Sequence, residues 1–114
     1  MNSGSLLKKD WRKTLLPKSA AIKEAIRSLD ESAMRIVLIV DSNLRLLGTV
    51  SDGDIRRGLL KGLDLESPVS GVIQKHPLVV TPGLKRELVL ELMMANKIQQ
   101  IPVVNEEARV VGLH

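Results

Sequence analysis

The sequence of 114 residues contains no cysteine, no phenylalanine and no tyrosine, and Trp11 is its only aromatic residue. Without cysteine the chain can form no disulfide and no thiolate metal site, which fits a reducing cytoplasm. Without further aromatic rings it lacks the stacking surfaces with which many proteins hold single-stranded nucleic acid. Its core must therefore be built from Leu, Ile, Val and Met.

Long apolar runs and the usual catalytic motifs are also missing. The longest apolar run, residues 36–40, is far shorter than the roughly 20 residues of a membrane helix, and residues 1–5 lack the apolar centre of a signal peptide. We therefore expect a cytoplasmic module with no membrane partner. No His and carboxylate pair stands at metal-ligand spacing, and no nucleophile elbow, Walker loop or GxGxxG is present. We accordingly expect no catalysis by this chain, no metal and no cofactor.

Acidic residues are fewer than basic ones, and the formal net charge is +4. The basic residues gather in residues 8–13 and 56–61. Clustered Lys and Arg neutralise phosphates, so an RNA-binding surface with a steep salt dependence is one interpretation. Solvated helix faces account for the same residues. We therefore expect no nucleic-acid partner, whereas a small anionic ligand fits both interpretations.

The sequence contains an internal repeat. When the sequence is shifted by 64 positions, its apolar pattern matches itself without a gap. The matched pairs include Met34 with Ile98, Val37 with Ile101, Ile39 with Val103, Leu46 with Val110 and Gly48 with Gly112. A unit of about 60 residues suits a small domain duplicated once rather than a solenoid.

Local patterns predict the elements of the first unit. Apolar residues three and four apart predict a helix over residues 22–33, with Ser19 as its cap. Strands over residues 35–41 and 45–50 then form a hairpin. Ser51 and Asp54 stand at the cap and third positions of a second helix, which ends near Gly62.

The second unit repeats this order in part. We expect a strand over residues 78–80, a helix that starts at Thr81-Pro82, and strands over residues 99–105 and 109–113. The core face of that helix is predicted to contain Leu84, Leu88, Val89, Leu92 and Met93.

The sequence thus predicts an α/β (α+β) fold of two β-α-β-β-α repeats, the second without its last helix. Residues 14–62 form repeat 1, residues 63–77 a connector and residues 78–114 the truncated repeat 2. Residues 1–13 are an N-terminal arm or a tag remnant, in which Trp11 either packs over an open face or forms an interaction arm.

The order of elements, the duplication and the segment from Gly48 to Asp54 resemble a tandem pair of cystathionine-β-synthase (CBS) domains, a nucleotide-sensing unit. Ser19 and the segment from Gln100 to Asn105 also match this family. More narrowly, residues 48–57 and 110–114 look like the pair that precedes the catalytic domain of mannose-1-phosphate guanylyltransferase-like sugar nucleotidyltransferases.

The resemblance implies a ligand such as AMP, ADP or ATP, bound between the repeats. Asp54 would accept hydrogen bonds from the ribose hydroxyls, and Ser51 would reach ribose or phosphate. Other residues would form the pocket for the base: Lys18, Ser19, Arg35, Ile36 and Val37 in the first repeat, and Gln99, Gln100, Ile101 and Pro102 in the second.

Simpler explanations stand beside this one. In the first of these, Ser51 and Asp54 serve only as a helix cap, and Asp52 is an acidic residue of the same first turn. The expected function is a regulatory module for an attached catalytic domain; the alternative is a structural dimerisation domain without a ligand. We expect a homodimer in both cases, because the uncovered second hairpin presents apolar surface.

Overall fold

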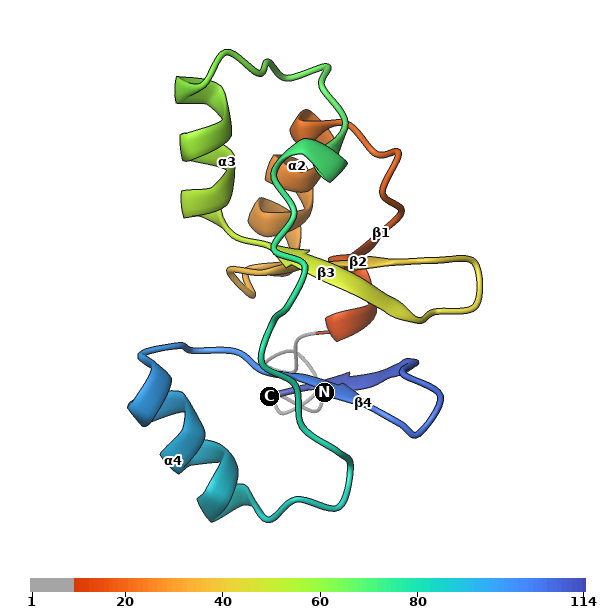
Figure 1. Ribbon diagram of the computed structural model, residues 1–114, viewed down its shortest axis with the longest axis vertical. Coiled ribbons are helices and arrows are strands. Elements are labelled where there is room, and N and C mark those ends of the chain that lie inside the picture. Colours follow the sequence, from red (N-terminus) through yellow and green to blue (C-terminus); the bar gives the residue numbers. More distant parts are fainter. Residues whose placement is uncertain (1–9) are drawn as a thin grey trace, which may run out of the picture.

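The computed structural model describes residues 10–114, so the predictions for residues 1–9 lie outside the described part. Repeat 1 contains η1 (Trp11–Thr14), β1 (Leu15–Leu16), α2 (Ile22–Ser32), β2 (Val37–Val40), β3 (Leu46–Val50) and α3 (Asp52–Leu60). The connector contains η2 (Val69–Gly71), and repeat 2 contains α4 (Arg86–Asn96), β4 (Pro102–Val104) and β5 (Val110–Leu113). Figure 1 shows the two repeats one above the other, with the connector passing between them. Within residues 10–114, no helix has the length and apolar character needed to span a bilayer.

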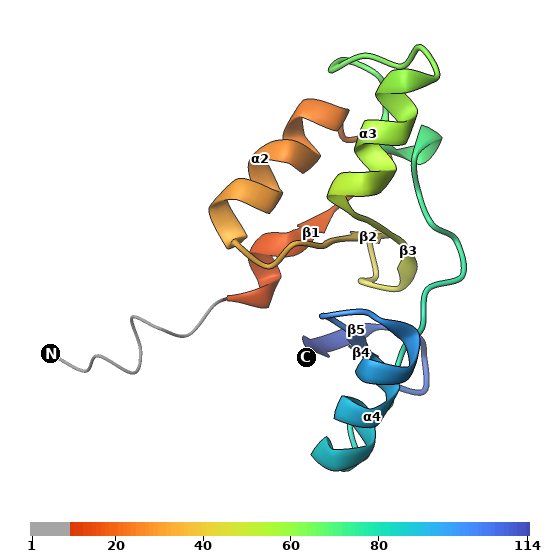
Figure 2. The same ribbon diagram turned by 90° about the vertical axis from the view of Figure 1, so that its left-hand side faces the viewer.

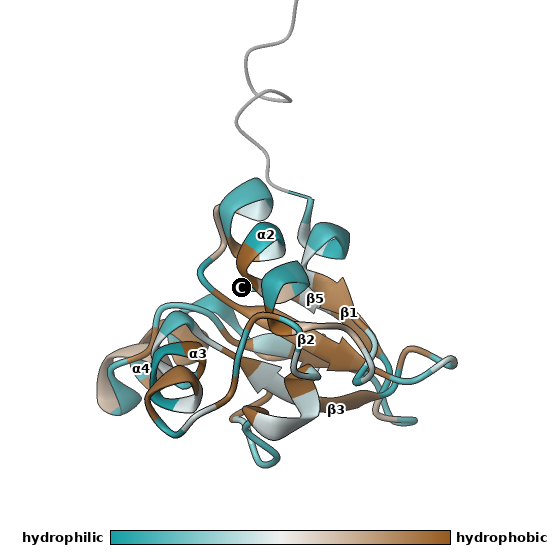
Figure 3. Cartoon of the chain, turned by 90° about the horizontal axis from the view of Figure 1, so that it is seen from above, coloured by the Kyte–Doolittle hydropathy of each residue, from teal (hydrophilic) through white to brown (hydrophobic). Residues whose placement is uncertain are grey.

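Repeat 1 is a three-stranded sheet covered by two helices. The strand order is β1-β2-β3, with β1 parallel and β3 antiparallel to β2. All four residues of β2 are buried, and α2 turns Ile22 and Ala25 into the same core. Figure 3 shows this distribution, with hydrophobic residues on the strands and hydrophilic ones on the outer turns of α2.

Helix α2 begins differently from the prediction. Ser19 is exposed, and Ala21 occupies the cap position. The Ala21 N–H is satisfied instead by Glu24, whose carboxylate Oε2 accepts it at 3.1 Å. A cap by Ser19 is therefore wrong, because carbonyls of the connector accept the first N–H groups of the helix: Ser67 O accepts the Ile22 N–H at 2.8 Å, and Leu65 O accepts the Lys23 N–H at 3.0 Å.

Repeat 2 is smaller, with β4 and β5 as an antiparallel pair. The strand predicted over residues 78–80 is reduced to one parallel bridge between Val80 and Val103. Helix α4 begins at Arg86 rather than at Thr81, because Thr81 starts a turn in which its carbonyl accepts the Leu84 N–H at 3.3 Å. Leu88 is 44% exposed and does not belong to the core face.

The predicted repeat of 64 positions is confirmed in the backbone, helices included. Helices α2 and α4 both have 11 residues and start at equivalent positions. Each ends at a left-handed residue, Ala33 with φ 56° and Lys97 with φ 54°, and the hairpin residues Leu44 and Ala108 share a φ of 65°. The two units therefore follow the same path at these positions, although the positive φ of Arg35 has no counterpart at Gln99.

The repeats meet through their hairpins around a pseudo-two-fold axis. Arg45 forms an antiparallel bridge with its own equivalent, Arg109. Two symmetric backbone bonds flank this bridge: Leu46 N–H to Ala108 O at 3.0 Å, and Val110 N–H to Leu44 O at 2.9 Å. Figure 2 shows η1 and the connector on opposite sides of the joined hairpins.

Trp11 packs against the apolar cluster that joins the repeats. Leu38, Val40 and Val110 are the buried members of this cluster, and the Trp11 ring is one of its partly buried neighbours. The Arg12 guanidinium lies over the ring, 4.7 Å from its centroid. The prediction that Trp11 packs over an open face is confirmed.

Asp41, in the first hairpin turn, makes the stability of the fold depend on pH. The Oδ1 atom of Asp41 accepts the N–H groups of Arg45 at 3.0 Å and Asn43 at 2.8 Å. The hydrogen bond from Arg45 is the main cause that lowers the pKa of Asp41 below its ordinary value of 3.8. A lowered pKa in the folded state stabilises the fold above the unfolded pKa, and this contribution is lost as the pH falls through the folded pKa. At the equivalent position, neutral Asn105 makes the same turn.

We therefore expect Asp41→Asn to retain the turn but to lose this acid-dependent contribution. Thermal unfolding of the wild type and the variant, from about pH 2 to about pH 7, tests this. The advantage of the wild type at neutral pH should shrink in acid. A constant difference between the two curves would contradict the prediction.

Candidate functional site

A cleft of about 550 Å³ lies between the two repeats. All three parts of the chain line it. Repeat 1 contributes Arg35, Ile36, Thr49, Ser51 and Asp54, the connector contributes Gln74, His76 and Pro77, and repeat 2 contributes Leu78, Asn96, Ile98, Gln99, Gln100 and Pro102.

The acidic corner of the cleft is the start of α3. Ser51 caps the helix, and its Oγ accepts the Asp54 N–H at 3.3 Å. In return, Oδ2 of Asp54 accepts the N–H of Ser51 at 2.8 Å and its O–H at 2.9 Å. The predicted capping box is confirmed. It fixes a carboxylate that is only 18% exposed at the edge of the cleft.

The other acidic residue of this turn, Asp52, does not line the cleft. It is exposed and forms an ion pair with Arg56, one turn further along α3. The interpretation of Asp52 as a first-turn acidic residue is therefore confirmed. Among residues 10–114, no three His, Asp or Glu side chains gather closely enough to hold a metal ion.

The rest of the cleft has apolar walls and amide edges. Ile36 and Ile98 are half-buried, and Pro102 is buried. Arg35 donates from Nη1 to Oε1 of Gln99, its own equivalent in the repeat, at 3.3 Å. Apolar surfaces with a few placed polar groups suit a flat heteroaromatic ring.

The predicted site residues separate into three groups. The cleft contains Arg35, Ile36, Ser51, Asp54, Gln99, Gln100 and Pro102. Val37 and Ile101 are fully buried in the cores of the two repeats. Their side chains point to the opposite face of the strand from Ile36 and Gln100, as alternation along a strand requires.

Lys18 and Ser19 are the third group, and they lie at a different place. They line a separate depression with Leu44. Strand β1 runs parallel to β2, with Leu16 beside Ile39, so the chain leaves β1 near the far end of β2. Arg35 and Ile36 precede the near end. The expectation that Lys18 and Ser19 join them in one base pocket is wrong.

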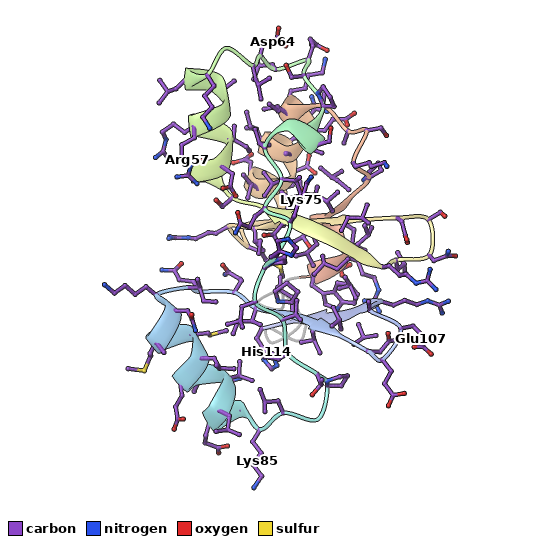
Figure 4. The ribbon with its side chains drawn as sticks, viewed as in Figure 1. Arg57, Asp64, Lys75, Lys85, Glu107 and His114 are labelled. Atoms are coloured by element: carbon purple, nitrogen blue, oxygen red, sulfur yellow. The ribbon has the colours of Figure 1, made fainter. Side chains whose placement is uncertain are left out.

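The connector was missed by the sequence analysis, and so were Thr49, Leu78, Asn96 and Ile98 of the two repeats. The Gln74 carbonyl accepts the Thr49 N–H at 3.0 Å, and the Gln74 N–H returns the bond at 2.8 Å. This bridge carries His76, Pro77 and Leu78 past the cleft. Figure 4 shows Lys75 on this segment, between the two repeats. The repeat of 64 positions gave one indication of this role. Residues 74–78 are equivalent to residues 10–14, which lead into β1.

Comparison with known proteins gives a consistent picture. The sequence profile of the CBS domain family matches residues 14–61 and 69–113. An uncharacterized protein of Helicobacter pylori (strain J99) is 34% identical over 105 residues, which are 87% of this chain and 30% of that protein. The arabinose 5-phosphate isomerase GutQ of Salmonella typhi is 28% identical over 94 residues, 82% of this chain and 29% of that protein. This chain thus spans about 30% of the length of these relatives.

Solved structures with the same fold include a CBS domain protein and a second protein. A CBS domain protein from Pyrobaculum aerophilum, complexed with AMP, has a TM-score of 0.79 and 25% identity, covering 100% of this chain and 86% of that one. A Vibrio cholerae protein named for acetoin utilization (AcuB) has a TM-score of 0.81 and 28% identity, covering 87% of this chain and 73% of that one.

Proposed function

This chain belongs to the CBS domain family, and from this membership and the geometry of the cleft we propose that it is a regulatory module that binds an adenine nucleotide. The proposal is carried by one observation: a single cleft joins the Ser51 and Asp54 corner of repeat 1 to the apolar wall and amides of repeat 2. A fixed carboxylate suits ribose hydroxyls, and the wall suits a base. The AMP complex of the similar Pyrobaculum aerophilum protein supports this choice of ligand.

Calorimetry with AMP, ADP, ATP, GTP and CTP tests the proposal. We expect heat of binding with at least one adenine nucleotide and weaker binding of CTP. No heat with any of them at millimolar concentration would favour the alternative, a structural dimerisation domain. Binding that falls steeply with salt and ignores the base would indicate a phosphate-binding surface instead.

We further propose that nucleotide binding controls a catalytic domain attached to this pair. Occupancy can shift the relative arrangement of the repeats only as far as the ligand binds one arrangement better than the other. The resemblance of residues 48–57 and 110–114 favours a sugar nucleotidyltransferase of the mannose-1-phosphate guanylyltransferase-like type. The relative GutQ is itself named for a sugar phosphate, which supports a role near sugar-phosphate chemistry. The absence of cysteine supports a cytoplasmic location.

Exposed apolar side chains on α3 and α4 support a homodimer. Leu60 is 83% exposed and Met94 80% exposed, and Figure 1 shows the two helices on the same side of the chain. Apolar surface of this kind gains from burial against a second copy. Light scattering of the wild type at micromolar concentration is expected to give the mass of a dimer.

Met94→Glu is expected to shift that mass toward the monomer. Leu65→Glu is the matched control, because Leu65 is also exposed, at 48%, but lies in the connector. A monodisperse wild-type monomer would contradict the proposal.

A further inference from the structure

The two oxygens of Asp54 are not equally available to a ligand. Oδ2 already accepts two hydrogen bonds from Ser51, at 2.8 and 2.9 Å. Oδ1 accepts one bond, from Nη2 of Arg57 at 2.8 Å. A carboxylate oxygen offers about two acceptor positions. A ligand that uses Asp54 must therefore share Oδ1 with Arg57 or displace it.

Arg57 is placed to be displaced easily. Its side chain is 66% exposed, and an ion pair between neighbours on a helix surface contributes little to stability. Its guanidinium lies against the first turn of α3, since a Cβ added at Gly53 would be 3.3 Å from Nη1 of Arg57. The N–H groups of a first helical turn also favour anions. Figure 4 shows Arg57 on α3, at the outer edge of repeat 1.

A second, smaller cavity continues from the cleft along α3. It measures about 210 Å³ and shares Asp54 and Gln74 with the cleft. Its charged side chains besides Asp54 are Arg57 and Lys61, and Lys61 forms no ion pair within residues 10–114. This cavity is smaller than the range of about 300–1,000 Å³ typical of ligand pockets. Its size and charge suit phosphate groups rather than a nucleoside.

We propose that Arg57 makes the site selective for phosphorylated nucleotides. In the unliganded chain its guanidinium occupies Oδ1 of Asp54 and competes with ribose. A phosphate group draws the guanidinium toward the small cavity, and this exchange frees Oδ1 for the ribose hydroxyls. A nucleoside has no phosphate group that could bind Arg57, so its ribose must compete with the ion pair between Arg57 and Asp54. The inference rests on the proposed nucleotide binding and deepens it.

Calorimetry of adenosine, AMP, ADP and ATP with three forms of the chain tests the proposal. Arg57→Gln is expected to weaken ATP binding about tenfold or more, because hydrogen bonds between charged groups are the strong ones. It is expected to leave adenosine binding unchanged or stronger. Arg56→Gln is the matched control, since Arg56 has the same charge on the same helix and pairs with Asp52, outside both cavities. It is expected to retain the wild-type ratio of ATP to adenosine affinity.

One result overturns the proposal: a ratio of ATP to adenosine affinity in Arg57→Gln equal to that of the wild type. An equal loss of both ligands in a variant whose thermal unfolding is unchanged is such a result. A wild-type chain that binds none of the four ligands overturns the proposed function and this inference with it. Lys61→Gln adds an internal check: it should weaken ATP more than AMP, and equal effects would place the phosphates elsewhere.

Discussion

Replacing Gly48 with alanine is expected to destabilise the chain by about 1–3 kcal/mol or more, the usual range for overpacking a close-packed interior. A Cβ at this position would lie 2.4 Å from the carbonyl oxygen of Gln74 and 2.6 Å from Cγ1 of Ile73. The carbonyl cannot move aside cheaply, because it accepts the Thr49 N–H at 3.0 Å. The substitution thus pushes the connector off β3. It should also weaken ligand binding, since Gln74 lines the cleft.

Gly112 provides the matched control, because it is the equivalent of Gly48 in repeat 2. A Cβ there would be 3.6 Å from Val103, an ordinary van der Waals contact. Gly112→Ala is therefore expected to change stability by no more than about 0.5 kcal/mol. Urea unfolding of both variants, with equal m-values, measures the difference. Equal losses at the two positions would show that the connector does not constrain Gly48.

Asp54→Asn is expected to weaken the binding of adenosine and of its phosphates alike, by about tenfold or more. A hydrogen bond to a charged group contributes about 1.5–3 kcal/mol, and the amide lacks that charge. Asparagine retains one acceptor oxygen for the Ser51 N–H, so the helix cap is expected to survive. Calorimetry with adenosine and ATP, combined with thermal unfolding, separates lost binding from lost folding.

Asp52→Asn is the matched control for Asp54→Asn, because it makes the same chemical change two residues earlier in the chain. Asp52 lies on the same turn of α3 but outside the cleft, so its variant should bind as the wild type does. Full adenosine affinity in a folded Asp54→Asn variant would mean that the ribose lies elsewhere. The pattern also differs from that expected for Arg57→Gln, which should discriminate between the two ligands.

The parts of the fold that the sequence predicted are those with a local signal. Short runs rich in β-branched residues placed the hairpins, and the chemistry of a cap placed Ser51 and Asp54 together at the start of α3. The repeat extended this register to helix α4, although its start at Arg86 differs from the Thr81-Pro82 predicted. A turn at Thr81 ends in backbone hydrogen bonds that the residue types alone do not specify.

The errors in the site come from non-local pairing. Lys18 and Ser19 were grouped with Arg35 because the family resemblance implied one base pocket for all three. Only the parallel register of β1 on β2, with Leu16 beside Ile39, shows that they lie at opposite ends of a strand. The bridge between Thr49 and Gln74 is equally non-local. For that reason the residue types of the connector do not by themselves indicate that it lines the cleft.

The bridge between Arg45 and Arg109 has a mechanical consequence. The hairpins join along a narrow line on the axis, with the connector on one side and η1 on the other (Figure 2). A rotation of the repeats about this line would narrow the space on the connector side while it widens the space on the η1 side. Trp11 packs on the cluster beside that line. The fluorescence of Trp11, the only aromatic residue of the chain, is therefore expected to change with the angle between the two repeats.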